Sequence, residues 1–80
     1  MVELMQTLDR IVCNPMIMGG KPVVRGTRVT VGTLVGLVAA GKSIDEILHA
    51  YPYISREDIQ QALSYAAWKA GESEVVLQEA

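Results

Sequence analysis

The sequence predicts a small, mainly α-helical domain in which a short N-terminal β-hairpin precedes three helices. Turn-forming and β-branched residues fill the first thirty positions, an apolar helical pattern begins at Thr30, and two further helices follow, each with a serine at its start. The short turn Tyr51–Ile54 joins those last two helices, which predicts a helix-turn-helix. Eighty residues correspond to one domain near the lower size limit for a stable core, so self-association would add useful buried area.

The N-terminal β-element is indicated by alternating turn and strand signals. Asn14-Pro15 and Gly19-Gly20 are typical of turns, and β-branched residues that favour strand follow at Val23, Val24, Val29 and Val31. The pair Gly26-Thr27 fits a two-residue hairpin turn with glycine first, where φ is positive. Arg25 and Arg28 would then oppose each other across the hairpin, and such like charges repel unless an acid or an external anion lies between them.

The first two helices have clear start and stop signals. Thr30 can serve as the N-cap of the first helix, and Gly41 is expected to end it. Apolar residues cover almost its whole circumference, which predicts a helix buried nearly all round, at Val31, Leu34, Val35, Leu37, Val38 and Ala39. The second helix starts with a capping box of Ser43 and Glu46 and must stop before Pro52.

The third helix is the second helix of the predicted helix-turn-helix. Ser55 is its expected cap, Asp58 lies at the third helical position, and Ile54 can pack on Ile59 as a hydrophobic staple. The helix is expected to end at Gly71, where an acidic tail, residues 71–80, begins.

Charge is distributed unevenly, although the net charge is only −2. Residues 1–42 carry five basic and two acidic side chains, whereas residues 43–80 carry two basic and seven acidic ones. The first part is suited to an anionic surface and the second to a basic partner. A dipolar surface that contacts neither is the alternative interpretation.

Several classes of function are not predicted. The single cysteine, Cys13, cannot form an internal disulfide and is expected to be a small buried residue. With only one histidine the chain lacks the usual zinc ligand sets, and His49 is expected to be structural or on the surface. Pro22 follows Lys21 where a P-loop requires Ser or Thr, and the acids at the helix starts are explained by capping. We therefore expect no enzyme, no metal and no cofactor.

The sequence indicates neither a membrane-spanning nor a secreted protein. Its longest apolar run, around residues 31–40, is too short for a membrane span and is interrupted by Gly32, Thr33 and Gly36. The first ten residues carry acids and have no basic segment before an apolar stretch, so they do not resemble a signal peptide. We expect a cytoplasmic protein that does not contact a membrane.

The run from Arg10 to Ala67 resembles the bacterial domain of unknown function family 433. The resemblance lies in GGKPVVRGTRV, AAGKSIDEIL, the Tyr-Pro pair at 51–52 and EDIQQALSYA. It implies a single domain of the homeodomain-like or winged-helix kind, with its core at residues 10–70. Some members of that family are regarded as antitoxins that pair with a PIN-like ribonuclease toxin and bind their own promoter, so the resemblance implies such a role for this chain. Thr30 stands where many relatives have proline and Gly36 where a larger aliphatic residue is usual, and these departures affect packing more than chemistry.

Candidate DNA-contacting residues fall in two groups. Phosphates are expected to bind the basic hairpin at Lys21, Arg25 and Arg28. Bases are expected to be read by exposed side chains at the start of the third helix, Arg56, Gln60 and Gln61. Glu57 and Asp58 would lie near phosphates and repel them, so this helix alone is a poor DNA ligand.

A protein interface is the alternative function. On a helical projection Tyr65 and Trp68 point away from the apolar stripe and onto a polar face, as expected for a partner interface or a homodimer. Alternatively, the tail covers them through Val75, Val76 and Leu77. The sequence thus predicts a binding protein that is a DNA-binding, antitoxin-like regulator or, alternatively, an interaction module that does not bind DNA.

Overall fold

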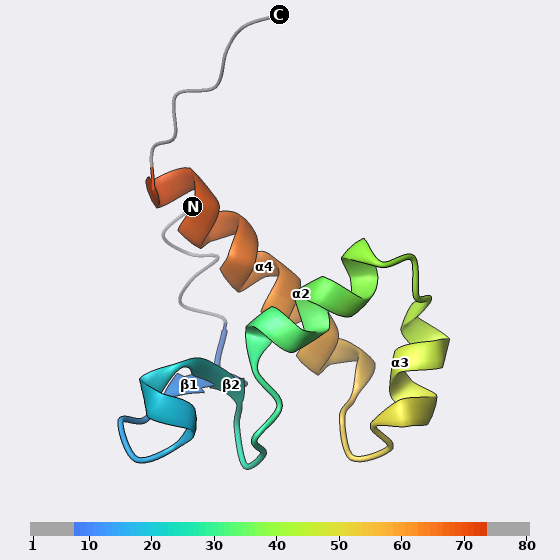
Figure 1. Ribbon diagram of the computed structural model, residues 1–80, viewed down its shortest axis with the longest axis horizontal. Coiled ribbons are helices and arrows are strands. Elements are labelled where there is room, and N and C mark those ends of the chain that lie inside the picture. Colours follow the sequence, from blue (N-terminus) through green and yellow to red (C-terminus); the bar gives the residue numbers. More distant parts are fainter. Residues whose placement is uncertain (1–7, 74–80) are drawn as a thin grey trace, which may run out of the picture.

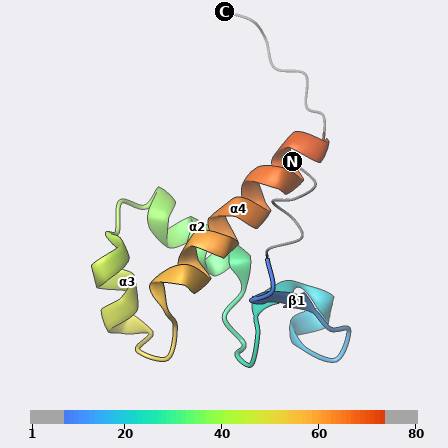
Figure 2. The ribbon, with the colours of Figure 1, turned by 180° about the vertical axis from the view of Figure 1, so that it is seen from behind.

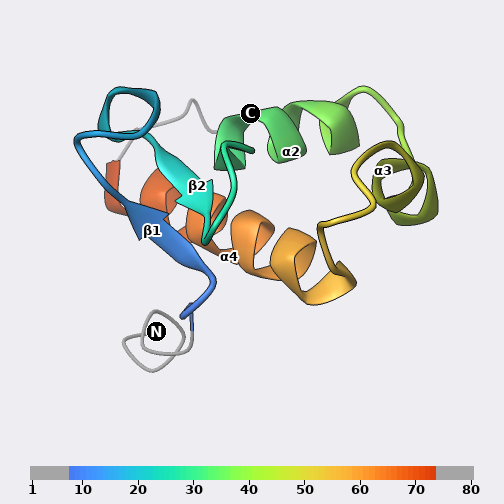
Figure 3. The ribbon, with the colours of Figure 1, turned by 90° about the horizontal axis from the view of Figure 1, so that it is seen from below.

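The structure, a computed structural model, describes residues 8–73 and the side chains of residues 8–71. Within this part the elements are β1 Ile11–Cys13, the 3₁₀ helix η1 Met18–Gly20, β2 Pro22–Val24, α2 Val31–Ala39, α3 Ile44–Ala50 and α4 Arg56–Ser73. Figures 1 and 3 show α2 crossing over α4, with the hairpin at one end of this pair and α3 at the other. The predicted fold class, a mainly helical domain with an N-terminal two-stranded hairpin, is confirmed.

The hairpin pairs different segments from those predicted. β1 and β2 run antiparallel, with the partners Ile11 and Val24, Val12 and Val23, and Cys13 and Pro22. The sequence predicted strands on either side of Gly26, but after β2 the chain folds back only through an isolated bridge between Val23 and Thr30. The sheet partner of β2 therefore comes from the start of the domain.

The segment Val24–Val29, called below the arginine loop, is closed by its own hydrogen bonds. The backbone N–H of Thr27 donates to the carbonyl oxygen of Val24 at 3.0 Å, and its hydroxyl donates to the same oxygen at 2.9 Å. That hydroxyl also accepts from the N–H of Val29 at 3.0 Å. Gly26 has the predicted positive φ, +79°, but occupies the third position of the turn. The turn therefore begins one residue earlier than predicted.

The three predicted helix starts are confirmed. The side-chain oxygen of each cap accepts from the backbone N–H three residues later, in the pairs Thr30 and Thr33, Ser43 and Glu46, and Ser55 and Asp58. In the last two pairs the acid accepts in return from the backbone N–H of the cap, which completes a capping box. Gly41, with φ +92°, follows α2 as predicted. The expected end at Gly71 is wrong, because this glycine has no positive φ and α4 continues to Ser73.

The core lies where the three helices meet the hairpin. Its most deeply buried apolar side chains are Val23, Val24, Leu34, Ile47, Ile59 and Ala62. Figure 2 shows from behind how α4 runs across α2. The prediction that α2 is buried nearly all round is wrong, since only Val31 and Leu34 on this helix are buried and Gly36 and Ala39 are exposed. Packing chiefly on α4 covers one face of α2 and leaves the other exposed among the described residues.

Candidate nucleic-acid interface

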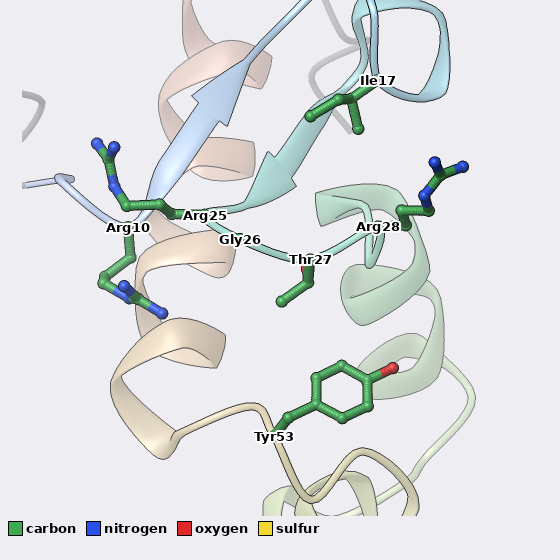
Figure 4. Close-up of a pocket in the computed structure, with 7 residues that line it drawn as sticks. All are labelled: Arg10, Ile17, Arg25, Gly26, Thr27, Arg28 and Tyr53. Carbon is green, nitrogen blue, oxygen red and sulfur yellow. The ribbon is translucent and has the colours of Figure 1, made fainter.

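An open depression, called below the arginine depression, lies between the arginine loop and the turn that joins α3 to α4 (Figure 4). It is lined by Arg10, Ile17, Arg25, Gly26, Thr27, Arg28 and Tyr53. These residues come from the start of β1, from the segments before and after β2, and from the α3–α4 turn. The lining holds three arginines and no acidic side chain, which makes this the candidate site for an anion.

The two arginines of the arginine loop point in different directions. The Nε of Arg25 donates to the backbone carbonyl oxygen of Asp9 at 2.8 Å. Arg28 is exposed and has no hydrogen-bond or ion-pair partner within the described part of the chain. Figure 4 shows the two side chains leaving the loop toward opposite sides of the depression. The predicted opposition of Arg25 and Arg28 is therefore wrong, because the earlier turn places Arg25 inside the turn itself.

Arg10 carries a compensated charge. Its Nε donates to Asp58 Oδ1 at 2.6 Å, in a salt bridge whose side chains are 37% and 1% exposed respectively. The hydrogen bond with Asp58 raises the pKa of Arg10 above its ordinary value. Sequence reasoning treated Arg10 only as one of several N-terminal charges, because its partner lies 48 residues away and no local motif connects them.

Asp58, the partner of Arg10, is buried rather than exposed to a ligand. Burial by itself raises the pKa of this carboxyl, but hydrogen bonds from Arg10 and from the backbone N–H of Ser55 outweigh it and hold the pKa below its ordinary value. The carboxylate is thus ionised, and each of its two oxygens accepts a hydrogen bond. The prediction that Asp58 lies near phosphates is wrong. The side chain of Asp58 is buried and forms a salt bridge with Arg10.

Gln61 was predicted to read bases from an exposed position, and that prediction is wrong. Its side-chain oxygen accepts from the backbone N–H of Arg10 at 2.8 Å, and its nitrogen donates to Asp9 Oδ1 at 3.0 Å and to Glu57 Oε2 at 3.1 Å. The residue is only 7% exposed. The segment before β1 lies against this face of α4, and an amide can both donate and accept there. Gln61 therefore holds the N-terminal segment on α4.

The remaining predicted DNA contacts lie outside the arginine depression. Arg56 and Gln60 are exposed near the start of α4, and Arg56 Nη2 donates to Asp45 Oδ1 at 2.7 Å in a surface salt bridge. Lys21 lines a separate open depression beside the first turn of α2. Of the residues predicted to bind DNA or an anion, only Arg25 and Arg28 line the arginine depression.

Tyr53 is a site residue that sequence reasoning missed. The residue is 63% exposed, and it lines the depression from the α3–α4 turn. The rings of Tyr51 and Tyr53 form an edge-to-face pair with centroids 6.2 Å apart. A tyrosine after a proline in a turn is a visible signal, but only the arginine loop on the other side of the depression gives Tyr53 its role in the site.

Comparison with known proteins identifies the family. Residues 11–66 match the family described as "Protein of unknown function (DUF433)". The chain belongs to the DUF433 family. It is 42% identical over 64 residues to the uncharacterized protein y4eO of Sinorhizobium fredii (strain NBRC 101917 / NGR234), and the alignment covers 80% of this chain but only 29% of that relative. The crystal structure of a DUF433 member protein from Anabaena variabilis ATCC 29413 matches with a TM-score of 0.74 and 30% identity, over 89% of this chain and 71% of the other.

A second aromatic group lies further along α4 of this DUF433 domain. The ring centroids of Tyr65 and Trp68 are 6.0 Å apart, and Lys69 Nζ lies 5.7 Å from the centroid of the Trp68 ring. Both aromatic residues are half-buried, and Tyr65 packs against the core. The prediction that Tyr65 points away from the core is therefore wrong, because it lies one helical turn after the buried Ala62. The predicted covering by the valines and leucine of the tail lies outside the described residues.

Other candidate chemistry in the DUF433 domain is limited to single side chains. Cys13 is exposed, contrary to prediction. The backbone of Arg10 is hydrogen-bonded to Gln61 on α4, and a residue three positions further along an extended strand points to the opposite face. His49 is exposed near the end of α3, within the predicted alternatives. Among the described residues no cluster of His, Cys, Asp or Glu could hold a metal ion, and no helix is long and apolar enough to cross a membrane.

Proposed function

We propose that this DUF433 protein is a binding protein that contacts DNA through the arginine depression and acts as an antitoxin-like transcriptional regulator. The observation that carries the proposal is that Arg25 and Arg28 line the depression with no acidic side chain in its lining, whereas the charge of the third arginine, Arg10, is already paired with Asp58. Phosphate groups suit such a lining, because a guanidinium forms paired, charge-assisted hydrogen bonds to phosphate oxygens.

Arg25 and Arg28 supply the charge for phosphate contacts. Arg28 has no ion-pair partner in residues 8–73, so no such pair has to be broken before a ligand binds. Arg25 is oriented by a backbone carbonyl, which positions the guanidinium without neutralising its charge. Both extend from a loop that is already closed by its own hydrogen bonds, which lowers the entropy lost on binding.

The start of α4 supports the same proposal. In a helix-turn-helix the exposed N-terminal part of the second helix enters the major groove, and here that part carries Arg56 and Gln60. The burial of Asp58 removes one of the two acids that oppose phosphate at this end, and leaves Glu57. The main phosphate affinity is therefore assigned to the arginine loop and the base contacts to α4.

Titration of the DNA upstream of the gene for this protein, followed by fluorescence anisotropy at several salt concentrations, tests the proposal. Arg25→Ala and Arg28→Ala are expected to weaken binding to all sequences and to reduce the salt dependence by about one unit each. Lys42→Ala is the matched control, because it removes an exposed positive charge that lines a different depression. It is expected to have a smaller effect than either arginine variant.

Thermal melts of the same variants separate binding from stability. If wild-type protein binds no DNA at low salt and both arginine variants melt several degrees lower, the arginines are structural and the DNA-binding proposal is refuted. Unchanged melting with lost binding supports it.

The antitoxin part of the proposal rests on the family resemblance and requires a protein partner. A PIN-like ribonuclease encoded by a neighbouring gene is the expected partner, and the side chain of Trp68 on α4 is the proposed contact. Co-expression followed by affinity purification should recover both proteins in one complex, and Trp68→Ala should release the nuclease. Failure of the wild-type pair to co-purify would refute the antitoxin role and leave DNA binding to its own test.

An interaction module that does not bind DNA is the second candidate function. It is favoured by the half-buried Trp68, an aromatic residue of a kind that is enriched at protein interfaces. Light scattering at micromolar concentration should give the mass of a homodimer, and Trp68→Ala should give the mass of a monomer. A monomeric wild-type protein would contradict the homodimer.

A further inference from the structure

Tyr53 differs from the other aromatic residues in its exposure. The chain has three tyrosines and one tryptophan, all within the described residues, and Tyr53 is the one of these four that is exposed. The other three are half-buried. The ring thus presents a large apolar surface to solvent on the wall of the arginine depression.

The turn fixes the backbone on both sides of Tyr53 before any ligand arrives. Pro52 precedes it, Ile54 follows it with only 4% exposure, and the N–H of Ile54 donates to the carbonyl oxygen of Tyr51 at 2.9 Å. Tyr51 packs against the core and contacts the Tyr53 ring edge-to-face. A side chain on a backbone that is already fixed loses less conformational freedom on binding, which favours the use of Tyr53 as a binding surface.

The rest of the depression combines apolar and cationic groups. Ile17 and Thr27 add aliphatic carbon to the wall, and a side chain at Gly26 would meet no atom within 4 Å, so there is open space at this point of the lining. Figure 4 shows the Tyr53 ring below the arginine loop, with Arg28 on the side toward which its hydroxyl points. An aromatic face near a cation fits a flat ring linked to a phosphate, the combination that a nucleotide presents.

We propose that Tyr53 stacks on an unpaired base while the arginine loop contacts its phosphate, so that the site binds single-stranded nucleic acid more tightly than duplex. This inference rests on the proposed binding of nucleic acid by the arginine depression and concerns that depression alone, because the duplex contacts proposed for Arg56 and Gln60 on α4 lie outside it. In a fully paired duplex the base faces are covered by neighbouring bases, so an exposed aromatic face gains nothing from them. Base–aromatic stacking is worth about 1–3 kcal/mol per base.

Tyr53 has one competing role in the same site. Its hydroxyl could instead donate a hydrogen bond to a backbone phosphate of a duplex. The two roles depend on different parts of the side chain, because stacking needs the ring and phosphate binding needs the hydroxyl. Tyr53→Phe keeps the first and removes the second, whereas Tyr53→Leu removes both.

The test uses one fluorescein-labelled DNA oligonucleotide from the region upstream of the gene, offered as a single strand and as a duplex with its complement. Wild-type protein is expected to bind the single strand at least about tenfold more tightly, and Tyr53→Leu to lose about tenfold or more of that affinity. Tyr53→Phe should stay within about twofold of wild type on the single strand. Arg28→Ala, which removes a proposed phosphate contact, should weaken the binding of both the single strand and the duplex.

Three results would overturn the inference. Equal losses in Tyr53→Phe and Tyr53→Leu would assign Tyr53 to a phosphate, and tighter binding of the duplex would exclude a preference for unpaired bases. Both leave the proposed function standing if Arg28→Ala still weakens binding. No binding of either form refutes the proposed function and this inference together.

A spectroscopic variant removes dependence on the folding of Tyr53→Leu. Tyr53→Trp combined with Trp68→Phe places a single indole in the depression, and its fluorescence should fall when the single-stranded oligonucleotide stacks on it. An unchanged emission during saturating binding, as measured by anisotropy, contradicts stacking.

Discussion

The side chains of Arg10 and Asp58 meet in a 2.6 Å hydrogen bond although the two residues are 48 positions apart. Asp58 also accepts from the backbone N–H of Ser55 at 3.0 Å. One buried carboxylate therefore joins the segment before β1 to the start of α4, directly beside the arginine depression. Stability and the geometry of the candidate site both depend on it.

Asp58→Ala is expected to lower the free energy of unfolding by about 2–4 kcal/mol, because it removes the reciprocal half of the capping box with Ser55 and leaves Arg10 without its partner. Asp45→Ala breaks the exposed pair with Arg56 and should cost less than about 1 kcal/mol. Urea denaturation measures both. Equal losses in the two variants would show that the Arg10–Asp58 contact does not hold the fold together.

The stability of the protein should decline in acid, and Asp58 should account for part of that decline. The pKa of Asp58 is lower in the folded state than in the unfolded state, so ionisation of Asp58 stabilises the fold at pH values above the ordinary, unfolded-state pKa of a carboxyl. This contribution is lost as pH falls through the lower folded-state pKa. Urea denaturation from neutral pH to about pH 2.5 should show a smaller acid-induced loss in Asp58→Asn than in wild type. Parallel pH profiles would contradict this assignment.

Gln60 and Gln61 form a matched pair of neighbouring amides with opposite environments. Gln61→Ala should lower the free energy of unfolding by about 1–3 kcal/mol, because the backbone N–H of Arg10 loses its acceptor. Gln60→Ala should change it by less than about 0.5 kcal/mol, because Gln60 is exposed. Thermal or urea denaturation distinguishes the two variants. A larger loss of stability in Gln60→Ala than in Gln61→Ala would contradict the burial of Gln61 and the exposure of Gln60.

Leu34 and Leu63 test the depth of the core. The sequence pattern alone predicts that alanine at either position costs about 2–5 kcal/mol. In the structure Leu34 is fully buried and Leu63 is half-buried, so Leu34→Ala should reach this range and Leu63→Ala should cost clearly less. Superimposable urea denaturation curves for Leu34→Ala and wild type would contradict the placement of α2 in the core.

Interactions over three or four residues could be derived from the sequence. The caps at Thr30, Ser43 and Ser55 all form as expected, since each depends on a hydroxyl and a backbone N–H three positions away. Positive φ at Gly26 and Gly41 was likewise predictable, because glycine alone adopts that conformation without strain. These local rules were sufficient for the fold class.

The candidate site depended on contacts between distant segments, which no local rule contains. Pairing of β1 with β2 brings the segment before β1 onto α4, and this contact buries Gln61 and Asp58 on a helix end that its sequence alone presents as polar and exposed. The same packing sets Tyr53 across from the arginine loop. The amino-acid sequence by itself thus determined the helices, their caps and the basic character of the loop. Only the tertiary structure decided which charges are neutralised and which side chains share the depression, because burial and ion pairing depend on neighbours that are close in space and far apart in the chain.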